Sequence, residues 1–114
     1  MENYSAALDR TFYTLSDPTR RAVLNRLMQG PAPVKELAAP FNMGLPSFMK
    51  HLKVLEESDL IRSEKAGRVR TCYVKAEPLA AAESWLSEQR ALWEARIDNL
   101  ANYVENEMSW STDK

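Results

Sequence analysis

One stretch constrains the fold of this chain more than any other: residues 44–74, where a short helical pattern runs into a basic hairpin pattern. Three apolar residues recur at steps of four and three and therefore share one helix face: Phe48, Leu52 and Leu55. Residues 61–65 and 69–74 then alternate in strand fashion about a tight turn at Ala66-Gly67. Because a lone hairpin is marginal in water, we expect its apolar side, with Val69, Thr71 and Tyr73 on one face, to pack on helices.

Three helices are predicted before this stretch. The first covers residues 3–15 and carries one apolar stripe, made by Leu8, Phe12 and Leu15. Asp17-Pro18 is typical of a cap followed by the first helical residue, and Gly30-Pro31 predicts where this second helix ends. The third helix is short, because Pro40 lacks a backbone donor.

The last predicted helix is the longest, at about residues 79–108. Its apolar residues recur at alternating steps of three and four once Arg90 is counted in the seam: Leu86, Trp93, Ile97, Leu100 and Val104. A small domain has difficulty burying so much apolar surface on one terminal helix, so we expect a partner. The alternative is that this helix folds back on its own domain.

Together these patterns predict a mainly α protein with a small β-hairpin, a winged helix-turn-helix of about five helices and a two-stranded wing. A chain of 114 residues is expected to form a single domain, 1–114, that buries roughly two-thirds of its unfolded surface. It has one cysteine, Cys72, and its first residues lack the pattern of a signal peptide. We therefore expect a cytoplasmic protein. Because no apolar run approaches the ~18 residues of a membrane span, we also expect no membrane partner.

Charge is distributed unevenly along the chain, although the net charge is only −1. Residues 60–75 carry five cations against the single acid Glu64, whereas acids dominate from Ala76 onward. A locally positive surface suits phosphate binding, although a charge run taken alone is more typical of a solvated hairpin. The face of the 46–56 helix turned away from its apolar residues is expected to be open, with Ser47 and Met49 at its flanks.

Four motifs carry a family resemblance: residues 16–21 (SDPTRR), 37–41 (LAAPF), 45–56 (LPSFMKHLKVLE) and 67–71 (GRVRT). In this order and spacing they resemble bacterial ArsR-family transcriptional regulators over nearly the whole chain. The resemblance implies a homodimeric repressor that places two reading helices about 34 Å apart on an imperfect palindromic operator in double-stranded DNA. Gly44 departs from the family pattern, which usually has Ser there.

The resemblance also implies which residues meet DNA and which meet a second copy of the chain. Ser47 can donate or accept at base edges, Met49 can contact a thymine methyl, and Arg68 can hold phosphates or enter the minor groove. The implied DNA-binding set is Leu45, Pro46, Ser47, Met49, Lys50, Lys53, Lys65, Arg68 and Arg70. Thr19, Arg20 and Lys35 are candidates for further phosphate contacts or for solvated surface. The implied dimer interface, formed by the first and last helices, is Tyr4, Leu8, Phe12, Leu86, Trp93, Ile97 and Leu100.

Metal sensing is the best-known trigger of that family, yet the ligands it needs are missing at the matching positions. Pro33 and Lys35 stand where the cysteine motif would fall, and the last helix has no histidine. We therefore expect a member that is not gated by metal and has no cofactor. His51 is expected to be half-buried and bonded to a neighbour rather than a pH switch, and Cys72 to be a small strand hydrophobe rather than a redox site.

Two other classes of function are an enzyme and a module for protein contact. Catalysis is disfavoured, because the single histidine belongs to the helix-turn-helix and no glycine-rich phosphate loop is present. A winged-helix module for protein contact without DNA readout is the stronger rival, because a fold does not fix a function. The release signal is open among a small organic ligand, a protein partner and no ligand.

Overall fold

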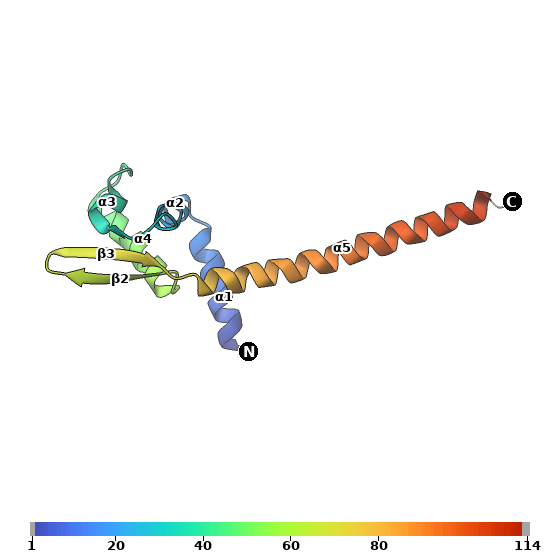
Figure 1. Ribbon diagram of the computed structural model, residues 1–114, viewed down its shortest axis with the longest axis horizontal. Coiled ribbons are helices and arrows are strands. Elements are labelled where there is room, and N and C mark those ends of the chain that lie inside the picture. Colours follow the sequence, from blue (N-terminus) through green and yellow to red (C-terminus); the bar gives the residue numbers. More distant parts are fainter. Residues whose placement is uncertain (1, 113–114) are drawn as a thin grey trace. The chain divides into compact units, whose positions relative to one another are not determined.

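The computed structural model describes the backbone of residues 2–112 and the side chains of residues 6–107. Its elements in order are α1 (Glu2–Leu15), α2 (Pro18–Leu27), β1 (Ala32–Pro33), α3 (Val34–Ala38), α4 (Leu45–Glu57), β2 (Ile61–Ala66), β3 (Val69–Val74) and α5 (Glu77–Thr112), as drawn in Figure 1. The chain forms two compact units, residues 1–82 and residues 83–114. The predicted fold class, mainly helical with a hairpin wing, is confirmed. No helix in the described part is long and apolar enough to cross a membrane.

Local signals set the helix ends. The Asp17 carboxylate accepts a hydrogen bond from the Arg20 N–H at 3.1 Å, which caps α2. At the end of α4, the N–H of Leu60 donates to the Leu55 carbonyl and the N–H of Asp59 to the Glu56 carbonyl, both at 3.0 Å. Asp59 has a positive φ of 65°, so these bonds form a left-handed Schellman cap that closes the helix.

The sheet differs from the predicted two-stranded wing. A third strand, β1, pairs with β3 through Ala32 opposite Cys72 and Pro33 opposite Thr71, so β3 lies in the middle. Two residues are too few to show alternation, which is why the sequence did not indicate β1. The predicted turn at Ala66-Gly67 was wrong by one residue, because Ala66 pairs with Val69 and leaves Gly67 and Arg68 as the two-residue loop. Gly67 supplies the positive φ, 63°, that such a loop needs.

The core of the first unit is built on α2, α4 and the base of the sheet. As predicted, α4 turns three residues inward: Phe48, Leu52 and Leu55, none more than 1% exposed. The hairpin packs through Cys72, which is fully buried, whereas Val69 on the other face is 52% exposed. The expectation that the face of Val69, Thr71 and Tyr73 packs on helices was therefore wrong, since the inward strand positions include Cys72. Among the described side chains of α1, from Ala6 to Leu15, the fully buried ones are Thr11 and Thr14, and the predicted apolar stripe is only half-buried.

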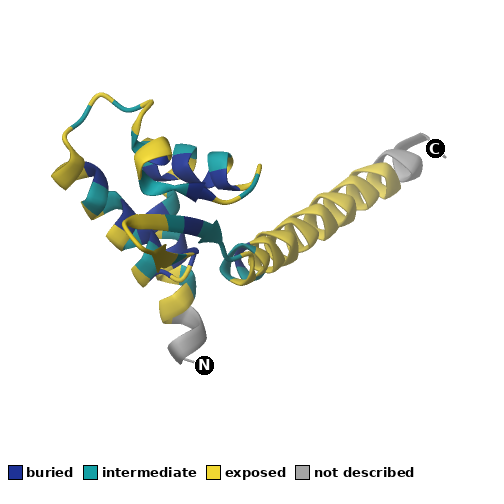
Figure 2. Cartoon of the chain, turned by 60° about the vertical axis from the view of Figure 1, so that its left-hand side comes forward, coloured by how far each residue is buried: buried dark blue, intermediate teal, exposed yellow. Residues whose placement is uncertain are grey.

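The second unit is helix alone. Every described side chain of α5 from Glu83 to Glu107 is exposed, and Figure 2 draws this stretch of the helix in yellow throughout. The exposed large apolar residues there include Leu92 at 67% and Leu100 at 64%. The predicted long helix is confirmed, and it is longer than the expected 79–108.

Candidate nucleic-acid interface

The outer face of α4 is open. Leu45 is 58% exposed, and Pro46, Ser47, Lys50 and Lys53 are also exposed, while Met49 is half-buried. The helix is fixed from behind by its three buried residues, and the Phe48 ring packs on the Phe41 ring with centroids 5.6 Å apart. A helix held on one face with its first turns exposed has the form that enters a DNA major groove.

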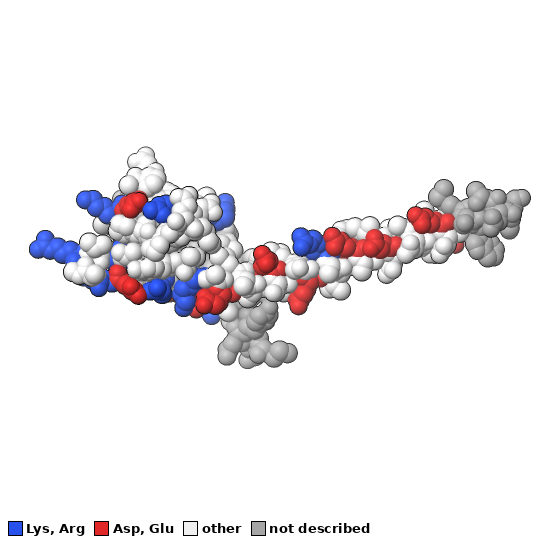
Figure 3. Space-filling view, in the orientation of Figure 1, with Lys and Arg blue, Asp and Glu red and all other residues white. Residues whose placement is uncertain are grey.

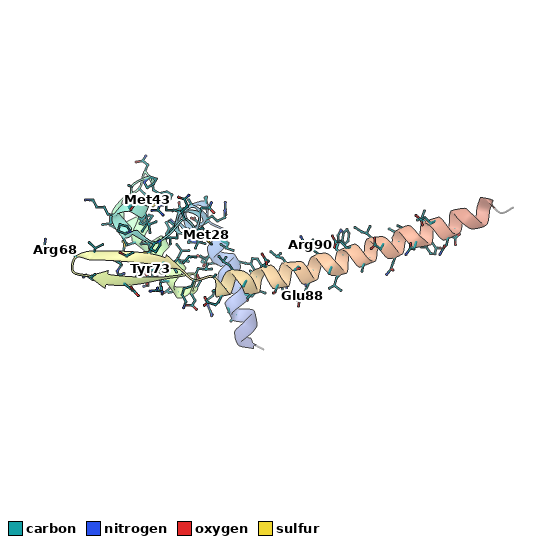
Figure 4. All side chains as sticks on the ribbon, viewed as in Figure 1. Met28, Met43, Arg68, Tyr73, Glu88 and Arg90 are labelled. Carbon is teal, nitrogen blue, oxygen red and sulfur yellow. The ribbon has the colours of Figure 1, made fainter. Side chains whose placement is uncertain are left out.

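The wing presents cations near its tip. The two-residue loop places Arg68 at the end of the hairpin (Figure 4), with Lys65 and Arg70 opposite each other on the two strands. Among the described residues, no carboxylate forms an ion pair with Lys65 or Arg68. Arg70 is less available, because its Nη1 lies 3.9 Å from Glu56 Oε1. These cations make the hairpin end positive, as the blue side chains in Figure 3 show.

The Arg62 side chain is held by contacts inside the wing. Its Nη1 lies 2.5 Å from Glu64 Oε2, and its guanidinium stacks 4.1 Å from the centroid of the Tyr73 ring. The pair neutralises the only acid of the hairpin. The positive potential of the wing therefore rests on Lys65, Arg68 and Arg70.

A groove of about 970 Å³ separates the wing from α3 and from the start of α4. Its walls bring together two parts of the predicted DNA-binding set that lie on different elements, Leu45 and Met49 of α4 and the wing cations. The lining residues are Pro33, Val34, Lys35, Ala38, Ala39, Met43, Leu45, Met49, Lys65, Arg68, Val69 and Arg70. The floor is apolar and the rim is cationic, with no acid in the lining.

Comparisons with known proteins agree with this geometry. The helix-turn-helix domain family matches residues 15–64. The regulator Rv2034 of Mycobacterium tuberculosis is 33% identical over 99 residues, which cover 87% of this chain and 90% of that protein. A crystal structure of an ArsR family transcriptional regulator is 59% identical, with a TM-score of 0.76, and covers 79% of this chain and 93% of its own. The repressor SdpR of Bacillus subtilis is 33% identical over 61 residues, which cover 54% of this chain and 68% of that protein.

This chain belongs to the ArsR family of winged helix-turn-helix transcriptional regulators. DNA binding is implied by that membership, and the named relatives are regulators rather than enzymes. Within this ArsR-family fold, the β2–β3 hairpin is the wing.

One candidate phosphate contact was wrong. Arg20 is only 7% exposed, and its guanidinium donates to the backbone carbonyls of Thr14 at 2.8 Å and Tyr13 at 3.2 Å. It therefore binds the Thr14 carbonyl at the end of α1, adds a bond to the Tyr13 carbonyl, which also accepts from Ser16, and ties α1 to α2. Nothing in the local sequence pattern distinguishes such a clamp from a surface arginine. Thr19 is half-buried, and Lys35 is exposed on the groove rim.

His51 behaves as expected. Its side chain is 23% exposed, and Nδ1 lies 3.3 Å from Arg20 Nη1 and 3.7 Å from Asp17 Oδ2. Burial alone would raise the pKa of Asp17, but the Arg20 N–H and the nearby charges of His51 and Arg20 outweigh it and lower that pKa. His51 is thus part of the corner that joins α2 to α4.

Cys72 lies inside the core. It has no exposed surface, and burial raises the pKa of its thiol, with a further contribution from the Glu56 carboxylate. A protonated, inaccessible thiol is unreactive. The interpretation of Cys72 as a small strand hydrophobe is supported by this environment.

The predicted dimer residues fall into three groups. Leu86, Trp93, Ile97 and Leu100 are exposed on α5, at 45–64%. Leu8 and Phe12 are half-buried on α1. The side chain of Tyr4 lies outside the described residues.

Proposed function

We propose that this ArsR-family regulator is a homodimeric repressor that reads an imperfect palindromic operator in double-stranded DNA. The observation that carries the proposal is the open outer face of α4 next to Lys65 and Arg68 of the wing, which no described carboxylate pairs. Base edges would be read by the first turns of α4, and phosphates would be held by the wing. The residues assigned to DNA are Leu45, Pro46, Ser47, Met49, Lys50, Lys53, Lys65, Arg68 and Arg70.

The homodimer rests on α5. Leu86, Arg90, Trp93, Ile97, Leu100 and Val104 follow one another at steps of four and three, the spacing of a helix-to-helix seam. The apolar members are exposed in the described chain, so pairing with a second copy would remove them from water. The interface is assigned to Leu86, Trp93, Ile97 and Leu100, with Tyr4, Leu8 and Phe12 of α1. A two-fold dimer would place its reading helices about 34 Å apart, one turn of DNA.

The proposed dimer is not gated by metal. The family's cysteine positions fall on Pro33 and Lys35, and the described part of α5 carries no histidine. Cys72 is buried and His51 is engaged by Arg20, so neither is poised to receive an ion. The repressor role is proposed by analogy with SdpR, whose name describes a transcriptional repressor. A protein-contact module without DNA readout is not favoured, because the named relatives regulate transcription.

Arg68→Ala tests the proposal. Loss of one phosphate contact should weaken binding to all duplexes and reduce the slope of log affinity against log salt by about one unit. Ser47→Ala should instead change which sequences are preferred. Both are measured by fluorescence anisotropy on duplexes that the wild-type protein selects from a random library. Arg10→Ala, an exposed arginine of α1, is the charge-matched control and should leave both quantities unchanged.

An Arg68→Ala variant with an unchanged salt slope, together with a Ser47→Ala variant with unchanged preference, would contradict the assignment of the reading face. The protein-contact alternative makes that prediction, because neither residue would then meet DNA.

A further inference from the structure

We propose that the groove between α3, α4 and the wing binds an amphiphilic anion, a single long alkyl chain with a negatively charged head, and that this ligand competes with DNA. The competition rests on the function proposed above, whereas the binding itself does not. The occupant is argued from the chemistry of the lining.

The floor of the groove is apolar and continuous with the core. Val34, Ala38, Met43 and Met49 line it, and all four also pack against the buried core cluster. A DNA backbone offers phosphates and sugars, which gain little from such a floor. An alkyl chain would gain by leaving water, at roughly 0.8 kcal/mol for each buried methylene. Two of the four are methionines, whose flexible side chains adapt to ligands of variable shape.

The rim selects the head group. Four cations line the groove and no acid does, so the charge complementarity is with an anion. Lys35 comes from α3 and Lys65 and Arg68 from the wing, and among the described residues none of these three is held by an ion pair. Arg70 is partly neutralised by Glu56 at 3.9 Å. The head is therefore assigned to Lys35, Lys65 and Arg68.

The volume fits one ligand per chain. Small-molecule sites occupy roughly 300–1,000 Å³, and the groove of about 970 Å³ lies within that range. A ligand in this space would lie against Leu45, Met49 and Arg68, which are also assigned to DNA. Occupation would therefore obstruct the reading face directly, without a conformational change.

The test uses tetradecanoate, below its micelle concentration, and isothermal titration calorimetry on the full chain without DNA. We expect saturable binding of one ligand per chain, at least tenfold weaker binding of the neutral 1-tetradecanol, and no measurable binding of butyrate. Tetradecyl sulfate should bind as tetradecanoate does, because the rim recognises negative charge rather than a carboxylate. No saturable binding, or equal affinity for the acid and the alcohol, would overturn the proposal.

Ala39→Glu locates the site. Ala39 is exposed and lines the groove, so an added carboxylate there should repel the head and weaken tetradecanoate binding at least tenfold. Ala80→Glu adds the same charge at an exposed alanine that does not line the groove and should leave the affinity unchanged. Binding that Ala39→Glu leaves intact would place the ligand elsewhere and overturn the proposal. Lys65→Glu, on the strand opposite Arg70, is a second variant and should also weaken tetradecanoate binding at least tenfold.

The DNA arm separates the two proposals. Wild-type protein is titrated with duplex DNA alone and then with duplex in the presence of saturating tetradecanoate, where we expect at least tenfold weaker DNA binding. Protein that binds duplex but not tetradecanoate would refute the groove ligand and leave the repressor proposal standing. Protein that binds tetradecanoate but no duplex would refute the repressor proposal, and with it the competition, and leave the groove ligand standing. Simultaneous binding of both at full affinity would overturn the competition.

Discussion

Residues 1–82 and residues 83–107 use their apolar side chains in opposite ways. In the first unit Phe48, Leu55 and Leu60 are each no more than 1% exposed, and the helices and sheet share one core. In the second unit Leu92, Trp93 and Leu100 are each at least 60% exposed. The helices of both units are periodic in sequence, so periodicity alone does not say whether an apolar helix face is covered by the same chain.

The difference teaches what each region needs in order to be stable. The first unit closes its core with contacts made inside one chain, and its free energy of unfolding should respond to core substitutions. The apolar face of α5 meets no covering element among the described residues of its own unit, which is the condition that marks an interface. Reading DNA would then depend on the first unit for the shape of each reading helix and on α5 for the spacing between two of them.

Leu55→Ala should have the largest effect, and it tests the first half of the comparison. Leu55 is fully buried in the core and forms part of the α4 cap, so its truncation leaves a cavity. We expect the free energy of unfolding to fall by about 2–5 kcal/mol, by the same amount at two protein concentrations. Urea unfolding followed by circular dichroism measures it. Met28→Ala, at a residue 55% exposed, should change it by less than about 0.5 kcal/mol. A loss below about 1 kcal/mol for Leu55→Ala would mean that this core is not what holds the unit together.

Leu100→Asp tests the second half of the comparison, that the exposed apolar face of α5 is an interface. A carboxylate in the seam of α5 would be buried against the partner helix, so the dimer dissociation constant should rise at least tenfold, or about 1.4 kcal/mol. The fold of each chain should survive, because Leu100 is 64% exposed within it. Sedimentation equilibrium measures the association. Asn99→Asp adds the same charge one residue away, off the seam, and should leave the dimer intact. If both variants dimerise equally well, α5 is not the interface.

Much of the fold could be predicted from the sequence because its signals are local. The buried side chains of α4, Phe48, Leu52 and Leu55, follow from their spacing of four and three residues along the helix. The start of α2 at Asp17-Pro18 follows from the chemistry of helix caps. The long α5 was predicted for the same reason. The open face of α4 then followed from geometry, because residues opposite a buried stripe must face outward.

The features that sequence reasoning missed depend on contacts between distant residues. β1 exists because Ala32 meets Cys72, forty residues away, and two residues carry no pattern of their own. Arg20 has the sequence context of a surface cation, yet three backbone and side-chain partners bury it. The groove is made by α3, α4 and the wing together, so its apolar floor shows only when the three are assembled.

Asp17 gives the smallest of the three expected effects and bears on how the first unit holds α2. Asp17→Ala removes the cap of α2 and should lower the free energy of unfolding by about 1 kcal/mol at neutral pH. Asp17→Asn keeps a cap oxygen but removes the charge, so it is the matched control for the electrostatic part. Seated beside His51 and Arg20, the carboxylate has a lowered pKa, and its charged form stabilises the fold.

That contribution is present above the ordinary carboxyl pKa of 3.8 and is lost as the pH falls below this value toward the lower pKa of the folded state. The stability gap between wild type and Asp17→Asn should therefore narrow with acidification below pH 3.8, whereas Leu55→Ala should keep its deficit across the same range. Urea unfolding of wild type, Asp17→Asn and Leu55→Ala at a series of pH values through this acid range measures both stability gaps. A gap that stays constant through this range would mean that the charged form of Asp17 adds no net stability over its protonated form, and would contradict the lowered pKa of this carboxylate.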